Sequence, residues 1–156
     1  MSAPVWRREL TRTRPFVLGV AGGTGSGKTT VAERLAGELG TASLALLTLD
    51  AYYLDRPYQP SPPPSGERLA INYDHPDAFD WALLRNHLQN LVAGQAVPMP
   101  TYDFTCDGRG SEVVWVAPST VVVVEGILVL YEPELRELFD LKVFVDTAAT
   151  TVTPCR

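Results

Sequence analysis

A glycine-rich segment at residues 22–29 carries the residues with the clearest chemistry. It reads Gly-Gly-Thr-Gly-Ser-Gly-Lys-Thr and fits the spacing GxxxxGK[ST]. Its glycines let the backbone curl tightly, so that successive N–H groups converge on anionic oxygens. Lys28 would reach the β- and γ-phosphates of a nucleoside triphosphate, and the Thr29 hydroxyl would hold Mg²⁺. The segment is therefore predicted to be a phosphate-binding P-loop, with Lys28 also catalytic and with nucleotide bound by Gly22, Gly23, Thr24, Gly25, Ser26, Gly27, Lys28 and Thr29.

The flanks of this segment have the pattern that a P-loop requires. Residues 15–21 before it are apolar and predict a buried strand. Residues 30–39 after it predict a helix, with Val31, Leu35 and Leu39 on one face. A dinucleotide-binding GxGxxG motif fits less well, because a match that begins at Gly23 places Lys28 at the final glycine position.

Three acids follow apolar runs at predicted strand ends. Asp50 follows residues 43–49, Glu125 follows four valines, and Asp146 follows residues 141–145. Ligands bind at the carboxyl ends of strands in open α/β sheets, and an acid there holds Mg²⁺ in P-loop enzymes. We therefore expect Thr29, Asp50 and Glu125 to form the metal site. Asp146 is interpreted as a helix cap or a solvated turn residue.

Length and composition limit the function classes. The 156 residues suggest one domain, and 46% hydrophobic residues can build a sizeable core. The net charge of −5 argues against a nucleic-acid-binding surface. Cys106 and Cys155 form no CxxC pair, which fits a reducing cytoplasm, and no apolar run is long enough to cross a membrane. Four arginines between residues 7 and 14 are expected in a flexible N-terminal extension, residues 1–15.

The remaining patterns predict an α/β fold of the P-loop NTPase type, with a doubly wound parallel sheet. Residues 57–65 hold five prolines and predict an irregular loop. Helical spacing at 81–91 predicts a helix that begins near Asp77 or Asp80 and ends at Gly94. Strands at 97–104 and 112–117 around a turn at 105–111 predict a β-hairpin excursion, residues 97–117. A strand at 120–124, a helix at 132–139 and a strand at 141–146 follow. The sheet is expected to be incomplete at its C-terminal end, and residues 147–156 are expected to be an unstructured tail.

Several of these segments together resemble uridine kinases, also called uridine–cytidine kinases. They are the P-loop, Asp-Ala-Tyr-Tyr at 50–53, Asn-Tyr-Asp-His-Pro-Asp-Ala-Phe-Asp at 72–80, Pro-Thr-Tyr-Asp-Phe at 100–104 and Val-Glu-Gly-Ile-Leu at 124–128. The resemblance implies a kinase domain over residues 16–146. It also implies transfer of the γ-phosphoryl group of ATP or GTP, with Mg²⁺, to the 5′-hydroxyl of uridine or cytidine. A cytoplasmic homotetramer is the expected assembly.

The resemblance also implies roles for individual residues. Asp50 would face the nucleoside hydroxyl and the metal, and Tyr53 would line the nucleoside pocket. Tyr73 and Asp74 would hold the base and the ribose, and Tyr102 would flank the base. These roles suit the side chains, because bases stack on aromatic rings and a carboxylate accepts hydrogen bonds from vicinal hydroxyls. Packing in the core or at the pocket rim is the alternative for the tyrosines.

Two positions differ from the family pattern. Asp107 stands where the family usually has a histidine that reads the base, and a carboxylate favours the amino group of cytidine over the carbonyl of uridine. Residues 147–156 do not match the family's arginine-rich lid, and Arg156 is their only basic residue. Two alternatives therefore stay open: a nucleotide-binding chain with impaired catalysis, and another P-loop small-molecule kinase of the phosphoribulokinase or pantothenate kinase kind.

Overall fold

The computed structural model describes residues 14–40, 43–55 and 72–146. The predicted unstructured tail, most of the N-terminal extension and the proline-rich loop lie outside these residues. The described elements are β1 (Phe16–Gly22), α2 (Lys28–Leu39), β2 (Leu44–Thr48), the 3₁₀ turns η2 (Leu49–Tyr52) and η3 (Pro76–Ala78), α3 (Trp81–Val92), β3 (Val97–Asp103), β4 (Gly108–Val116), β5 (Val121–Gly126), α4 (Pro133–Leu138) and β6 (Leu141–Val145).

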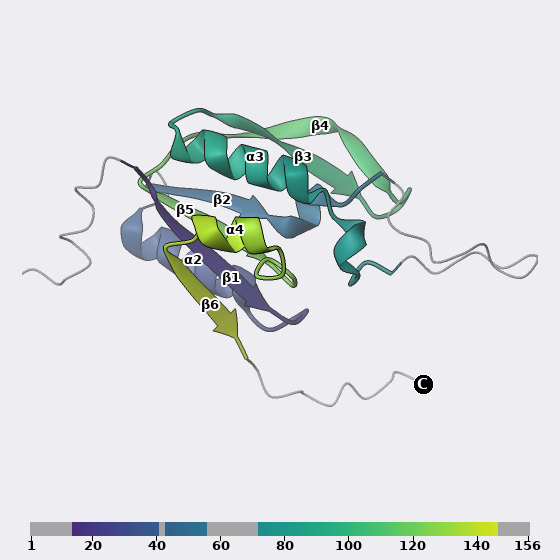
Figure 1. The fold of residues 1–156 in the computed structure, drawn as a ribbon, viewed down its shortest axis with the longest axis horizontal. Helices are drawn as coiled ribbons and strands as arrows, with labels where there is room; N and C mark the ends of the chain where they lie inside the picture. The colour runs from purple at the N-terminus through teal and green to yellow at the C-terminus, as the bar shows by residue number, and fades with distance from the viewer. Residues whose placement is uncertain (1–13, 41–42, 56–71, 147–156) are drawn as a thin grey trace, which may run out of the picture.

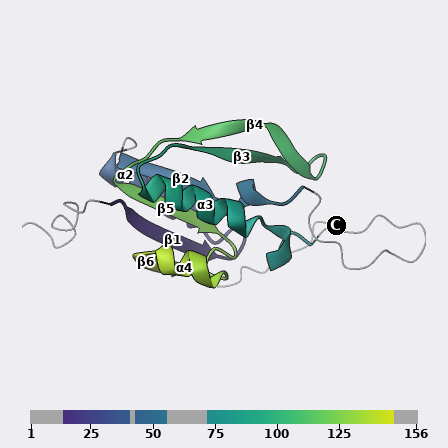
Figure 2. The same ribbon diagram turned by 45° about the horizontal axis from the view of Figure 1, so that its top comes forward.

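The main sheet is parallel, as the sequence predicts. Its order within the described residues is β2-β5-β1-β6, and β3 and β4 form a separate antiparallel hairpin. Helices α3 and α4 lie on one face of the sheet and α2 lies on the other, while the hairpin extends over α3 (Figures 1 and 2). The predicted α/β fold with a hairpin excursion is confirmed.

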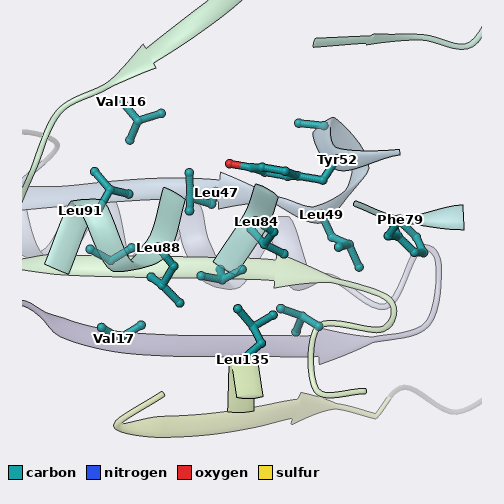
Figure 3. Packing of buried hydrophobic residues seen from close by; sticks show 14 of the residues in the cluster. Val17, Leu47, Leu49, Tyr52, Phe79, Leu84, Leu88, Leu91, Val116 and Leu135 are labelled. Carbon is teal, nitrogen blue, oxygen red and sulfur yellow. The ribbon is translucent and has the colours of Figure 1, made fainter. Parts of the chain in front are cut away.

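Alternation along the strands divides the core into two clusters. In β5, Val122 and Val124 pack with the α3 and α4 side, and Val121 and Val123 pack toward α2. This pattern explains why β5 reads as an unbroken valine run, since both of its faces are covered. The larger cluster is shown in Figure 3 and includes Val17, Leu47, Tyr52, Leu84, Leu88, Leu91, Val116 and Leu135.

Two local predictions need adjustment, and the structure decides a third between its two alternatives. Residues 108–111 were expected in a turn but belong to β4, where Tyr102 and Arg109 are opposite each other across the hairpin. The strand at 43–49 ends at Thr48, and Asp50 lies in η2 rather than directly at the strand end. Of the two candidate caps, the Asp80 carboxylate accepts a hydrogen bond from the Leu83 N–H at 3.0 Å and caps α3. Among the described residues, no helix has the length and apolar character to cross a bilayer.

Candidate functional site

The glycine-rich loop joins β1 to α2 through backbone conformations that favour glycine. Gly25 and Gly27 have φ angles of +74° and +93°, in the left-handed region that L side chains rarely adopt. Gly27 occupies the N-cap position of α2, and no side chain caps this helix. The first turn of α2 also contains no acidic residue. The N–H groups of this turn and the positive end of the helix dipole are therefore placed for an anion.

Lys28 begins α2 and lies across the loop. Its Nζ donates to the carbonyl oxygen of Gly23 at 2.7 Å, and the residue is only 8% exposed. Ser26 Oγ is buried and meets no hydrogen-bond partner among the described residues. A Cβ at Gly22 would come within 2.6 Å of this oxygen, so the loop closes on a site too tight for a side chain. A buried hydroxyl without a partner, beside a lysine, fits the oxygens of a phosphate.

Asp50 and Glu125, two of the three predicted strand-end acids, lie near each other and near this lysine. In the sheet, Thr48 of β2 is opposite Glu125 of β5, and Asp50 follows two residues after Thr48. Burial raises the pKa of Glu125, and the charge of Asp50 raises it further, while Lys28 acts in the opposite direction. Burial also raises the pKa of Asp50, and Lys28 partly offsets this effect. The Lys28 charge thus acts on both carboxylates, which is the effect of a cation close to two acids.

The donor set fits a magnesium ion better than a metal held by protein ligands alone. No cluster of three or more His, Cys, Asp or Glu side chains suited to a metal occurs in the described ranges. Mg²⁺ instead takes one or two carboxylates together with phosphate oxygens and water. Asp50 and Glu125 supply two carboxylates that repel each other, and a cation would relieve this repulsion. Thr29, an exposed residue in the first turn of α2, could contribute its hydroxyl as a third oxygen.

Beyond these acids, aromatic side chains gather from three separate segments. The Tyr53 ring centroid lies 5.1 Å from that of Tyr73 and 5.1 Å from that of Tyr102. Phe79 stacks on Tyr53 at 4.4 Å, and Phe104 lies 4.9 Å from Tyr102. The structure thus brings together the three tyrosines predicted for the nucleoside pocket. It adds Phe104, which sequence reasoning did not assign although it lies in the Tyr-Asp-Phe segment.

The tyrosine hydroxyls of this cluster have different partners. The Tyr53 hydroxyl donates to the carbonyl oxygen of Tyr73 at 3.2 Å, and the Tyr73 hydroxyl donates to the Asp107 carboxylate. Burial raises the pKa of Tyr73, and its hydrogen bond to Asp107 raises it further. The Tyr102 hydroxyl is buried near that of Tyr73 but meets no partner with hydrogen-bond geometry in the described residues. Asp107, with a φ of +53°, is the only described residue other than glycine with a positive φ.

One tyrosine connects the two halves of the site. Burial raises the pKa of Tyr53, and the charges of Asp50 and Asp74 raise it further. Asp50 belongs to the phosphate end, and Asp74 belongs to the segment before η3. The backbone N–H of Asp74 donates to the Asn72 side chain at 3.0 Å, and the Asp74 side chain is exposed. Acids from both parts of the site therefore act on Tyr53, which packs in the aromatic cluster.

Comparisons with known proteins show what this chain is similar to. Residues 17–152 match the family described as "Phosphoribulokinase / Uridine kinase family". A uridine kinase from Deinococcus deserti is 52% identical over 136 residues, which are 87% of this chain and 64% of that protein. A uridine kinase from Halalkalibacterium halodurans is 50% identical over 136 residues, which are 87% of this chain and 63% of that protein. The chain thus spans less than two thirds of the length of these curated relatives.

Solved structures share the fold. A structure described as a "Possible Uridine Kinase", from Bacillus stearothermophilus, superposes with a TM-score of 0.65 at 24% identity, over 88% of this chain and 74% of that one. D-glycerate 3-kinase from Cryptococcus neoformans superposes with a TM-score of 0.52 at 26% identity, over 76% of this chain and 44% of the other.

Proposed function

Because the chain belongs to the phosphoribulokinase/uridine kinase family, we propose that it transfers the γ-phosphoryl group of ATP or GTP to the 5′-hydroxyl of a pyrimidine nucleoside, uridine or cytidine. The observation that carries this proposal is the position of Tyr53. Tyr53 follows Asp50 by three residues, its ring contacts those of Tyr73 and Tyr102, and the charges of Asp50 and Asp74 both raise its pKa. A nucleoside has matching chemistry, because it joins a hydroxyl that can accept phosphate to vicinal ribose hydroxyls and a flat base.

Each end of the site would hold one substrate. The loop N–H groups, Lys28 and the Ser26 hydroxyl would bind the triphosphate. The rings of Tyr53, Tyr73 and Tyr102 would surround the base, and Asp74 would accept hydrogen bonds from the ribose hydroxyls. When bound, Mg²⁺ at Asp50, Glu125 and Thr29 would neutralise charge on the transferred phosphoryl group.

Asp50 would act mainly by orienting the acceptor hydroxyl. Phosphoryl transfer passes through a loose transition state, so placement and charge neutralisation matter more than strong base catalysis. A carboxylate is a weak base for an alcohol even with its pKa raised by burial, as in Asp50. Asp50 would therefore hold the 5′-hydroxyl in line with the phosphorus and accept its proton late.

We further propose that Asp107 favours cytidine. One oxygen of its carboxylate accepts the Tyr73 hydroxyl, which leaves the other oxygen to accept from an exocyclic amino group. A carboxylate repels a carbonyl oxygen at the same place, as uridine would present. Measurement of kcat/KM for the two nucleosides tests this preference, and a clear preference for uridine contradicts it.

Two other functions share parts of this argument. D-glycerate 3-kinase has the same fold, so a different small-molecule acceptor is the first alternative. The aromatic cluster around Tyr53 favours a flat acceptor over a small hydroxy acid. The second alternative is a chain that binds nucleotide with little turnover. Arg156 is the only basic residue among residues 147–156, and an arginine that neutralises the transition state can contribute about 10³–10⁵ in rate. The cytoplasmic location and the tetramer remain predictions.

An acceptor panel with Mg·ATP and Mg·GTP separates these functions. The parent chain is expected to phosphorylate cytidine and uridine but not D-glycerate. In Asp50→Asn, turnover is expected to fall by orders of magnitude while ATP still binds. Lys28→Ala is expected to weaken ATP binding itself, as titration with a fluorescent ATP analogue would reveal. Asp146→Asn is the matched control, because Asp146 is also an acid after a strand but is exposed at the end of β6. Equal turnover of the Asp50 variant and the parent contradicts the role of Asp50.

A further inference from the structure

Arg109 on β4, opposite Tyr102, is the one described arginine that connects the hairpin to the Tyr53 segment, and phosphoryl transfer at the P-loop does not require an arginine there. Its Nε donates to the carbonyl oxygen of Tyr53 at 3.2 Å, and an NH2 group donates to the Asp80 carboxylate at 2.8 Å. We propose that Arg109 is a positioning residue: it fixes the β3–β4 hairpin, which carries Tyr102, against the segment that carries Tyr53, and so sets the aromatic surface that these two tyrosines present to the base. The identity of the ligand on that surface rests on the proposed function.

The hairpin side of this connection is direct. Tyr102 of β3 and Arg109 of β4 are opposite each other in the antiparallel ladder. Residues directly opposite in such a pair have side chains on the same face, with their Cβ atoms close together. An irregularity in register between Pro100 and Tyr102 precedes this rung. A bulge of this kind changes the direction in which the following side chains point. Arg109 therefore anchors the hairpin at the residue pair that includes Tyr102.

The opposite side of the connection is a short bridge between two chain segments. Tyr53 and Phe79 form an isolated antiparallel bridge, flanked by hydrogen bonds from Leu54 N–H to Ala78 and from Asp80 N–H to Tyr52, both 2.8 Å. The guanidinium contacts both strands of this bridge, at the Tyr53 carbonyl and at Asp80.

The second carboxylate oxygen of Asp80 is already used. It accepts the Leu83 N–H at the start of α3, so Arg109 connects the hairpin to α3 as well as to η2.

Backbone contacts reinforce this arrangement. The Arg109 N–H donates to the Asp55 carboxylate at 3.2 Å. A Cβ on Gly108 would lie 2.9 Å from the same carboxylate oxygen, so glycine permits Asp55 to come this close. Because Asp55 follows Tyr53 by two residues, the hairpin is held to this segment at two separate points.

Arginine suits this position for a physical reason. Its planar guanidinium presents several N–H donors in a fixed fork, whereas lysine offers a single mobile charge. Arg109 and Asp80 have side chains that are 29% and 26% exposed, so the pair is partly shielded from water. Lysine could keep the pairing with Asp80 but could not also hold the Tyr53 carbonyl in the same geometry.

The test compares Arg109→Lys and Arg109→Gln with the parent. Both variants are expected to raise KM for the nucleoside about tenfold, as expected for loss of a charge-assisted hydrogen bond. The kcat should change less, and the affinity for an ATP analogue should stay at the parent value because the P-loop is not touched. An unchanged nucleoside KM in both variants overturns the proposal.

Arg85→Gln is the matched control. Arg85 is also a half-buried arginine, with its side chain 27% exposed, and pairs with Glu132 at 2.8 Å and Glu134 at 2.7 Å. These pairs connect α3 to α4 rather than to the hairpin. Its removal is expected to lower stability without a change in nucleoside KM. An equal rise in KM in this control would mean that any lost ion pair has the same effect, and would overturn a specific role for Arg109.

Hydrogen exchange separates the proposal from the proposed function. Amides of residues 102–109 are expected to exchange at least threefold faster in Arg109→Gln than in the parent, with the amides of α2 unchanged, because one tertiary hydrogen bond is lost. Parent-like exchange in the hairpin overturns the positioning role even where the parent is an active kinase. An inactive parent with faster hairpin exchange in the variant contradicts the nucleoside kinase activity and leaves the positioning role supported.

Discussion

Replacement of Gly126 by alanine is expected to disable the site from within the core. Gly126 ends β5 directly after Glu125, and an added Cβ would lie 2.3 Å from the Cβ of Leu49. Leu49 is fully buried and begins η2, the turn that carries Asp50. A Cβ atom is fixed to the backbone, so no change of rotamer at Leu49 can relieve this contact. The backbone of η2 has to move, and Asp50 moves with it.

The size of the effect follows from this distance. Carbon atoms pack best at about 3.5–4.0 Å, so η2 has to shift by about 1 Å or more. Overpacking of this kind costs about 1–3 kcal/mol. At about 2–4 °C per kcal/mol, the Tm should fall by about 2–12 °C. A misplacement of about 1 Å in a catalytic group can cost about 10²-fold in rate, so kcat should fall about 100-fold.

Two other glycines serve as controls in the same assays, thermal unfolding and steady-state kinetics. A Cβ on Gly19 would lie 2.6 Å from ring atoms of Phe139, a side chain that can shift without moving η2. Gly19→Ala should therefore lower Tm to a similar extent but leave kcat near the parent value. Gly37, inside α2, has nothing within 4 Å of an added Cβ, so Gly37→Ala should raise the free energy of unfolding by about 0.5–1 kcal/mol.

The reasoning is refuted by a Gly126→Ala variant that melts and turns over like the parent. It is also refuted if Gly19→Ala loses as much kcat as Gly126→Ala, since the loss would then follow stability rather than the position of Asp50. Binding of an ATP analogue to Gly126→Ala should persist, because the three heavy atoms nearest to the added Cβ all belong to Leu49 rather than to the P-loop.

Two further predictions concern buried polar groups. Because burial and Asp50 raise the pKa of Glu125, its charged form destabilises the folded protein, and Glu125→Gln should unfold at higher urea at pH 7 without Mg²⁺. The stability advantage of Glu125→Gln should shrink as the pH falls through the raised pKa and vanish below about 4.3, where glutamate is neutral in both states. A pH-independent difference in stability would contradict this prediction. The same variant should also lose Mg·ATP binding. In the core, the Tyr52 hydroxyl bonds to His87 Nδ1 at 3.0 Å, so Tyr52→Phe should cost about 1–3 kcal/mol in urea unfolding with little change in kcat/KM. Parent-like stability would mean that this buried bond contributes nothing.

Local patterns were sufficient to predict most of the fold. The strand, glycine loop and helix around Lys28 follow from apolar runs on both sides of a motif with few conformational options. The valines of β5 predict a central strand because both sheet faces cover it. Asp80 was one of two proposed caps, and its place three residues before the Leu83 N–H decides between them.

Contacts between distant residues explain what the sequence did not reveal. Residues 108–111 have turn-like composition, but β4 begins at Gly108, where Arg109 meets partners 29 and 56 residues away in Asp80 and Tyr53. No local signal distinguishes such an arginine from a solvated one. The Asp107 carboxylate likewise accepts a hydrogen bond from the Tyr73 hydroxyl, 34 residues earlier. The sequence of the hairpin turn alone could not predict this bond.

The uncapped start of α2 has a consequence for dynamics. Only Lys28 and Ala32 of this helix are buried, and the cluster beneath it is the smaller of the two. Amide protons in the first turn of α2 should therefore exchange quickly in the empty protein, through local opening. A bound phosphate would supply the missing acceptor for these N–H groups. Nucleotide would then slow exchange most in the first turn of α2, so that the ligand itself completes the end of the helix.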